Sequence, residues 1–159
     1  MEFRSSLTAI SRKDPSAPIK KLYEAGLVLA NDVLDYGCGK GKDVFWLQSQ
    51  NVNAFGWDPF FKNGQLQQNE YPYNQSWDVI LCTYVLNVLP LVQRKKTITH
   101  ILSLLKKNGR AYFTVRADKI QGTPYQDGII TKRLTFQKTF TPEILQKTIQ
   151  NSTIVFNEQ

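Results

Sequence analysis

Short apolar runs and longer stretches of helical spacing alternate along the chain. Runs of strand length occupy residues 33–35, 53–57, 77–82, 110–115 and 153–156. Apolar residues recur with a helical period in residues 18–27, 42–49, 91–107 and 142–150. The run at 77–82 is almost continuously apolar, which is typical of a parallel strand buried on both faces. The alternation predicts an α/β fold: a doubly wound, mostly parallel sheet with helices on both faces.

The ends of the chain and residues 62–75 depart from this alternation. Residues 1–17 mix Ser, Thr, Arg and Pro, which predicts an extended N-terminal arm before a folded domain over 18–159. Residues 62–75 are rich in Gln and Asn, so a third strand there should be degenerate. In the predicted helix over 91–107, His100 lies away from the apolar stripe and is expected to face solvent.

Composition narrows the class of protein. The 159 residues are 42% hydrophobic and 21% charged, which is ordinary for a folded domain. The sequence contains no apolar run of membrane-spanning length and no signal segment, so a cytoplasmic protein without membrane attachment is expected. Two cysteines and one histidine do not make a zinc site, and no metal is expected.

The charge balance is basic. Twenty Lys and Arg against thirteen Asp and Glu give a formal net charge of +7. Several of these cations are adjacent in sequence, at 12–13, 20–21, 94–96, 106–107 and 132–133. They indicate either a polyanionic partner or solubilising faces of helices and loops, and charge alone does not decide between the two.

A glycine-rich turn follows the first predicted strand. Ligands of open parallel sheets bind outside the carboxyl ends of the strands. There Gly37, Gly39 and Gly41 stand at alternate positions, where they permit positive φ and a close approach of a ligand to the backbone. Asp58 ends the second predicted strand, 21 residues after Gly37, where an acid can accept hydrogen bonds from both hydroxyls of a ribose. A plain turn at Asp58-Pro59 is the alternative, but together the two features predict a nucleoside ligand.

Asp35 distinguishes between nucleotide ligands. The dehydrogenase fingerprint is G-x-G-x-x-G, whereas here the glycines alternate and an acid lies two residues ahead of the first. A pyrophosphate at the helix N-terminus would be repelled by the Asp35 carboxylate, while a ligand with an ammonium group and a sulfonium cation would not. An NAD-dependent oxidoreductase is therefore kept as a lesser alternative.

The turn resembles motif I of the class I S-adenosylmethionine-dependent methyltransferases, Asp58 resembles the second-strand acid of that superfamily, and residues 77–82 resemble its fourth-strand motif. The resemblance covers about residues 18–156 and implies S-adenosylmethionine as cofactor. It implies these cofactor-binding residues: Asp35, Tyr36, Gly37, Cys38, Gly39, Gly41, Asp58, Pro59 and Cys82. The usual last antiparallel strand of that fold is expected to be missing, which leaves a sheet edge for a second copy of the chain, as a homodimer, or for a partner protein.

A narrower resemblance involves several short segments. They are similar to methyltransferases associated with bacterial DNA phosphorothioation systems, at residues 7–12, 35–39, 56–59, 84–88 and 135–138. This resemblance implies a link to DNA modification or defence.

Methyl transfer is an in-line displacement in which positioning supplies much of the catalysis, so no conspicuous catalytic residue is required. The positions after the fourth and fifth strands of the fold make Tyr84, Asn87 and Arg116 the catalytic candidates, with a core aromatic and a helix cap as the alternative roles of Tyr84 and Asn87. Residues 87–90 lack the Asn-Pro-Pro-Tyr or Asp-Pro-Pro-Tyr element of many DNA amino-methylating enzymes. Cys82 lacks the Pro-Cys loop of cytosine-C5 enzymes, which argues against a nucleophilic role.

The acceptor is the open question. Phosphates could be held by Arg12, Lys13, Arg116, Lys132 and Arg133. Residues 123–125 and Phe136 could stack a base, so a nucleic acid or nucleotide acceptor is favoured. The loop that contains these residues could instead close over a small molecule and exclude water. A further alternative is not an enzyme: the chain could bind the cofactor without catalysis and serve as a module that binds a partner.

Overall fold

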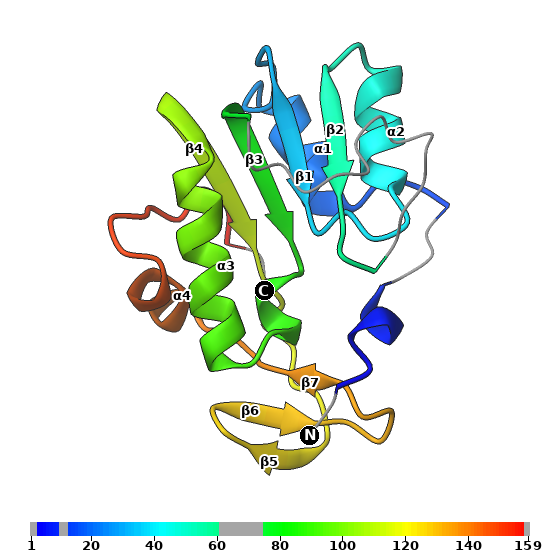
Figure 1. Cartoon of the computed structure of the whole chain (residues 1–159), viewed down its shortest axis with the longest axis vertical. Coiled ribbons are helices and arrows are strands. Elements are labelled where there is room, and N and C mark those ends of the chain that lie inside the picture. Colours follow the sequence, from blue (N-terminus) through cyan, green and yellow to red (C-terminus); the bar gives the residue numbers. More distant parts are fainter. Residues whose placement is uncertain (1–2, 10–12, 61–74, 158–159) are drawn as a thin grey trace.

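A four-stranded parallel sheet forms the centre of the protein. The computed structural model describes residues 3–9, 13–60 and 75–157. Within these residues the sheet consists of β1 (Val33–Tyr36), β2 (Ala54–Trp57), β3 (Trp77–Thr83) and β4 (Leu105–Thr114). The strand order is β2-β1-β3-β4, and every neighbouring pair is parallel (Figure 1). The reversal of strand order between β1 and β3 is the switch point at which ligands bind in such sheets.

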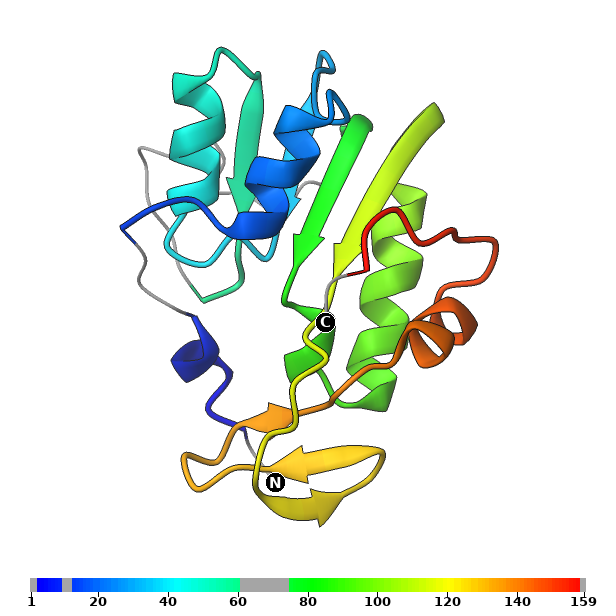
Figure 2. The ribbon, with the colours of Figure 1, turned by 180° about the vertical axis from the view of Figure 1, so that it is seen from behind.

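Helices cover both faces of this sheet, as the doubly wound fold predicts. Alternate strand residues point to opposite faces, so Val33 faces one layer and Leu34 the other. The first face packs against α1 (Ala17–Glu24) and α2 (Lys42–Ser49). The second face packs against α3 (Leu91–Ser103) and α4 (Pro142–Thr148). Figure 2 shows α1 on the side opposite to α3. Thr141 caps α4, because its hydroxyl accepts a hydrogen bond from the Ile144 amide at 3.2 Å.

The helix predicted over 91–107 is too long. It ends at Ser103, and β4 begins at Leu105. The Trp77 amide donates a hydrogen bond to the Leu104 carbonyl at 2.8 Å, which fixes the chain beside β3 directly after the helix. The Lys106 ammonium then contacts Asp32 at 2.6 Å and Asp78 at 3.1 Å. These contacts between distant segments override the local helical spacing.

The strand predicted over 153–156 is also wrong. These residues form no strand, and Ile154, Val155 and Phe156 are exposed. A β-branched run becomes a strand only when a partner strand accepts its hydrogen bonds, and the described part of the chain pairs nothing with this one. The degenerate third strand expected at 62–75 falls almost wholly outside the described residues. Within the described ranges, no helix reaches the length and apolar character that a membrane crossing requires.

A second, smaller sheet lies beyond the carboxyl ends of the parallel strands. It is antiparallel and contains β5 (Thr123–Tyr125), β6 (Gly128–Ile130) and β7 (Phe136–Gln137). Two 3₁₀ helices lie on the same side, η1 (Ser5–Thr8) and η3 (Leu86–Val88). Figures 1 and 2 both place η1 and the small sheet opposite the ends of β1 and β3. The arm predicted to be extended therefore contains a 3₁₀ turn, and residues 123–125 and Phe136, which were predicted to lie in a loop, belong to this sheet.

Candidate active site

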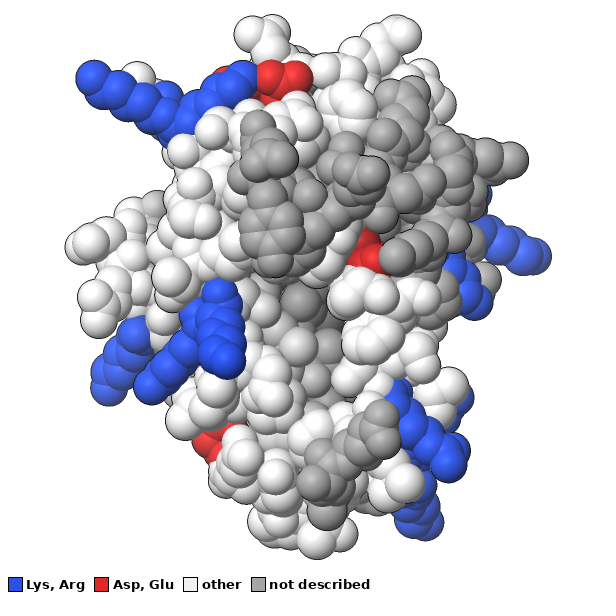
Figure 3. Space-filling model, in the orientation of Figure 1, with Lys and Arg blue, Asp and Glu red and all other residues white. Residues whose placement is uncertain are grey.

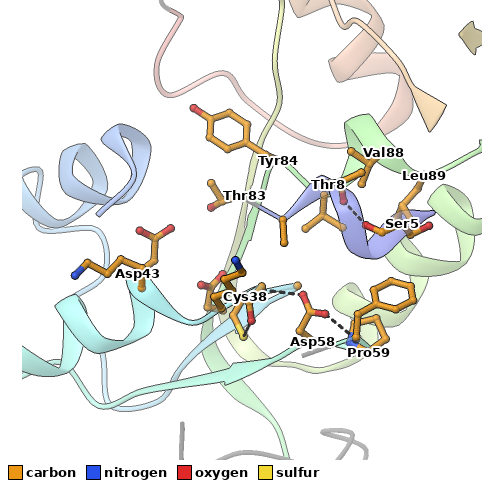
Figure 4. Close-up of a pocket in the computed structure, with 18 of the residues that line it drawn as sticks. Ser5, Thr8, Cys38, Asp43, Asp58, Pro59, Thr83, Tyr84, Val88 and Leu89 are labelled. Carbon is orange, nitrogen blue, oxygen red and sulfur yellow. Dashed lines mark hydrogen bonds between the residues drawn. The ribbon is translucent and has the colours of Figure 1, made fainter. Parts of the chain in front are cut away.

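A cavity of about 360 Å³ opens at the carboxyl ends of β1, β2 and β3. Its wall is formed by η1, the glycine turn, the first turn of α2, the end of β2 and the segment from Thr83 to Leu89 (Figure 4). The cavity thus lies at the switch point of the sheet, where the sequence predicts the site. Of the predicted cofactor residues, six line it: Asp35, Gly37, Cys38, Gly39, Asp58 and Pro59.

The glycine turn has a backbone shape that other residues rarely adopt. Gly37, Gly39 and Gly41 have φ of 79°, 55° and 82°. A Cβ placed on Gly37 would also lie 2.5 Å from Val85 Cγ2, which is closer than van der Waals contact allows. Gly41 is the N-cap of α2 and does not line the cavity. The turn therefore needs glycine for its conformation. At Gly37 it also needs glycine because the turn packs closely against Val85.

Asp58 is fixed at the edge of the cavity by two backbone amides. The Gly39 amide donates to Asp58 Oδ2 and the Phe60 amide to Oδ1, each at 2.8 Å (Figure 4). Each carboxylate oxygen can accept more than one hydrogen bond, so these two bonds orient the carboxylate without using its full capacity as an acceptor. Asp58 thereby couples the end of β2 to the glycine turn.

Two further acids line the cavity. Asp35 is 3% exposed at the end of β1. Asp43, in the first turn of α2, accepts hydrogen bonds from the Ser16 amide at 2.6 Å and the Ser16 hydroxyl at 2.7 Å. Asp43 was not predicted as a site residue, because an acid near a helix N-terminus is common and gives no specific signal. Three acids against Lys40 and Lys42 give this lining an excess of negative charge.

The surroundings of both cysteines favour the protonated thiol. Burial raises the pKa of Cys38 and of Cys82, and the nearby Asp35 carboxylate raises both further. A protonated thiol is a poor nucleophile, which agrees with the sequence argument against a nucleophilic Cys82. Cys82 is fully buried and does not line the cavity. Cys38 packs on Gly56, where an added Cβ would lie 2.7 Å from its Sγ, so close packing requires glycine at Gly56 as it does at Gly37.

Tyr36 belongs to the opposite face of the sheet. Its hydroxyl lies 2.8 Å from His100 Nδ1 on α3, and Tyr36 does not line the cavity. The prediction of a solvent-facing His100 is therefore wrong. Burial lowers the pKa of His100. The sequence could not show this pair, because the two residues are 64 positions apart.

The three catalytic candidates lie in different surroundings. Tyr84 lines the cavity and has a φ of 59°, which is unusual for a residue with a side chain. Asn87 is buried, and its amide group donates to the carbonyls of Arg116 at 3.1 Å and Lys138 at 2.9 Å and accepts from the Arg116 amide at 2.9 Å. The Arg116 guanidinium bonds both oxygens of Asp118 at 3.0 and 2.7 Å. Neither Asn87 nor Arg116 lines the cavity.

Three of the predicted phosphate-binding cations, Lys13, Lys132 and Arg133, are exposed and do not line the cavity either. Arg12 falls outside the described residues. Figure 3 shows Lys and Arg side chains on several separate parts of the visible face. Phe136 is 1% exposed, so a base cannot stack on its ring in this structure.

The arm is part of the cavity wall. Ser5, Thr8 and Ala9 line the cavity opposite the glycine turn. The Thr8 hydroxyl donates to the Ser5 carbonyl at 2.6 Å and stabilises the turn of η1. Val88 and Leu89 complete this side.

The fold is similar to that of a methyltransferase of known structure. No curated protein matches the chain. Among solved structures, it is similar to the Burkholderia thailandensis 1,6-didemethyltoxoflavin-N1-methyltransferase with bound 1,6-didemethyltoxoflavin and S-adenosylhomocysteine, with a TM-score of 0.64 and 19% identity. The similarity covers 84% of this chain but 64% of that one, so the chain spans less than two thirds of its length. At this identity the likeness shows the fold.

The family itself is identified by the sequence. Residues 7–140 match the family described as a methyltransferase domain, so the match includes the arm, the glycine turn, Asp58 and the small sheet. This confirms the predicted methyltransferase family, and S-adenosylmethionine is the cofactor that the family uses. The chain therefore belongs to the methyltransferase-domain family.

Proposed function

We propose that this chain binds S-adenosylmethionine in the cavity between the glycine turn and η1 and transfers its methyl group to an acceptor there. The observation that carries the proposal is the positive-φ glycine turn facing a carboxylate, Asp58, that two backbone amides hold in place. The cofactor-binding residues are those of the predicted set that line the cavity, with Asp43 added.

The lining suits this cofactor. A cavity of about 360 Å³ lies within the range of small-molecule sites. The Asp35 and Asp43 carboxylates suit a ligand with ammonium and sulfonium cations, and Asp58 suits ribose hydroxyls. When bound, S-adenosylmethionine supplies an electrophilic methyl group. The glycines let it lie close to the backbone, and η1 shields it from water.

The remaining wall supports a small, uncharged acceptor. On the side formed by η1 and the segment after β3, the lining side chains are hydroxyl-bearing or apolar, namely those of Ser5, Thr8, Ala9, Thr83, Tyr84, Val85, Val88 and Leu89. An apolar wall with a few hydroxyl groups buries an uncharged molecule at little desolvation cost and orients it by hydrogen bonds. Orientation is the main requirement for in-line transfer. Tyr84 is the catalytic candidate that this wall contains.

A nucleic acid acceptor is the second candidate. The arm binds the small sheet through the Arg4 amide and the Leu134 carbonyl at 3.1 Å, which brings the exposed Lys132 and Arg133 beside the arm. With a formal charge of +7, such cations could hold phosphates. The link to phosphorothioation systems, a partner at the β4 edge and a cytoplasmic location stay predictions.

Binding and transfer measurements test the proposal. Calorimetry should show binding of S-adenosylmethionine and S-adenosylhomocysteine, and labelled S-adenosylmethionine should then methylate members of a pool of uncharged heterocycles. Transfer only to DNA or RNA would favour the second candidate. Binding without transfer to any pool would favour a module without catalysis. Failure of both ligands to bind, or tighter binding of NADH, would overturn the cofactor assignment.

A further inference from the structure

We propose that Phe3, Arg94 and Asp127 are positioning residues that hold the N-terminal arm over the cofactor cavity and thereby set the rate at which the bound cofactor leaves. The proposal rests on the proposed function, because it takes the cavity to be the cofactor site. It is carried by a continuous series of contacts from the glycine turn, through the arm and the small sheet, to α3.

The arm lies close to the glycine turn. A Cβ built on Gly39 would lie 3.6 Å from the Cβ of Ala9, so Ala9 is a neighbour of Gly39 on the cavity side. Ser5 and Thr8 line the same cavity, and Figure 4 shows η1 across the cavity from Cys38 and Asp58. A ligand lying along the glycine turn is therefore enclosed by the arm on its outer side.

The beginning of the arm is anchored on the small sheet. The Phe3 ring packs edge-on against Tyr125, with centroids 5.5 Å apart, and against Phe136 at 6.0 Å. The adjacent Arg4 amide donates to the Leu134 carbonyl at 3.1 Å. Phe136 is buried, so it provides a fixed surface for the Phe3 ring. The position of η1 thus depends on the position of the small sheet.

The small sheet is in turn fixed to α3 by a buried ion pair. Arg94 is 2% exposed and bonds both carboxylate oxygens of Asp127, in the β5–β6 turn, at 2.7 and 3.1 Å. The same guanidinium donates to the Leu89 carbonyl at 3.0 Å, and Leu89 lines the cavity. A bidentate pair fixes distance and orientation together. Arg94 therefore holds the small sheet and the cavity wall to one helix.

This series of contacts predicts a kinetic effect that a purely structural role would not give. Loosening an anchor leaves the glycine turn and Asp58 unchanged but lets the arm move away more often. Because release requires the arm to move, S-adenosylhomocysteine should dissociate faster, while its association changes little.

The test measures dissociation of S-adenosylhomocysteine from the full chain by surface plasmon resonance. Phe3→Ala, at the edge of the fold, should raise the dissociation rate about tenfold with an unchanged thermal unfolding midpoint. Phe3→Tyr, which keeps the ring contacts, should restore the rate. Asp127→Asn should act in the same direction through the other anchor. Lys106→Met is the matched control. It removes the ion pairs of Lys106 with Asp32 and Asp78, which lie at the amino ends of the parallel strands and away from the cavity.

The outcomes separate this inference from the proposed function. Unchanged dissociation in Phe3→Ala would overturn the inference, and so would an equal acceleration in Lys106→Met. If Asp127→Asn fails to fold, Phe3→Ala and Phe3→Tyr still decide the matter. Absence of S-adenosylhomocysteine binding in the unaltered chain would instead overturn the proposed function.

Discussion

The carboxylate of Asp58 has two tasks, since it orders the glycine turn and faces the cavity. Asp58→Ala removes the acceptor of the Gly39 and Phe60 amides as well as the proposed ribose contact. We expect S-adenosylhomocysteine binding to weaken by about 1–3 kcal/mol, measured by calorimetry. Asp58→Asn keeps one acceptor oxygen and should lose less. An unchanged affinity in Asp58→Ala would refute the role.

Gly37 combines backbone strain with close packing, and these two costs can be separated. In Gly37→Ala the new Cβ meets Val85 at a φ of 79°, so we expect the free energy of unfolding to fall by about 1–3 kcal/mol in urea titrations. Gly26→Ala is the control, because Gly26 has a φ of 74° and nothing within 4 Å of the added Cβ. It should cost less. Adding Val85→Ala to Gly37→Ala should recover part of the loss, and no recovery would contradict the packing explanation.

Residues of the site were predictable when their signal is local. Gly37 and Asp58 directly follow strands, and the carboxyl ends of adjacent parallel strands meet at one edge, so sequence position alone brings them together. Asn87 has no such local signal, because its partners, Arg116 and Lys138, are 29 and 51 positions away. A buried amide with distant partners looks the same in sequence as a catalytic one.

At the scale of elements, η3 depends on Asn87 to join the ends of β4 and β7. Asn87→Ala leaves two carbonyls and one amide without this partner. We expect the free energy of unfolding to fall by about 1–3 kcal/mol, with little change in S-adenosylhomocysteine affinity. Chemical denaturation and calorimetry on the same preparation measure both quantities. A stable variant that loses methyl transfer would instead support the catalytic role predicted from sequence.

The elements that sequence could not predict are those whose partners are distant. The parallel strand β3 was predictable because burial on both faces makes it an apolar run. The strands β5, β6 and β7 span only two or three residues each, too few to show alternation. Their stability comes from contacts such as those of Phe136 with Tyr125 and Phe3. Residues 153–156 show the converse, since strand propensity without a partner strand produced no strand.

For the whole molecule, stability near neutral pH should depend on one side chain. His100 is the only histidine, and histidine is the side chain whose ordinary pKa lies between pH 5 and 8. Burial lowers its pKa in the folded state, where its ring bonds the Tyr36 hydroxyl. As the pH falls below about 6.5, the unfolded chain therefore takes up a proton before the folded chain does, and the free energy of unfolding decreases.

His100→Gln removes this difference in proton uptake while keeping a side chain that can bond Tyr36. The unaltered chain should lose stability between pH 7.5 and pH 5, where carboxylates are still ionised, and the variant should show a flatter profile over the same range. Urea denaturation at a series of pH values measures both profiles. Tyr36 lies next to Gly37 in sequence, so the loss of stability at low pH should also loosen the glycine turn. The affinity for S-adenosylhomocysteine should therefore decrease as the pH is lowered, and the decrease should be larger in the unaltered chain than in His100→Gln. Parallel pH profiles in the two proteins would show that the Tyr36–His100 pair has no part in stabilising the turn.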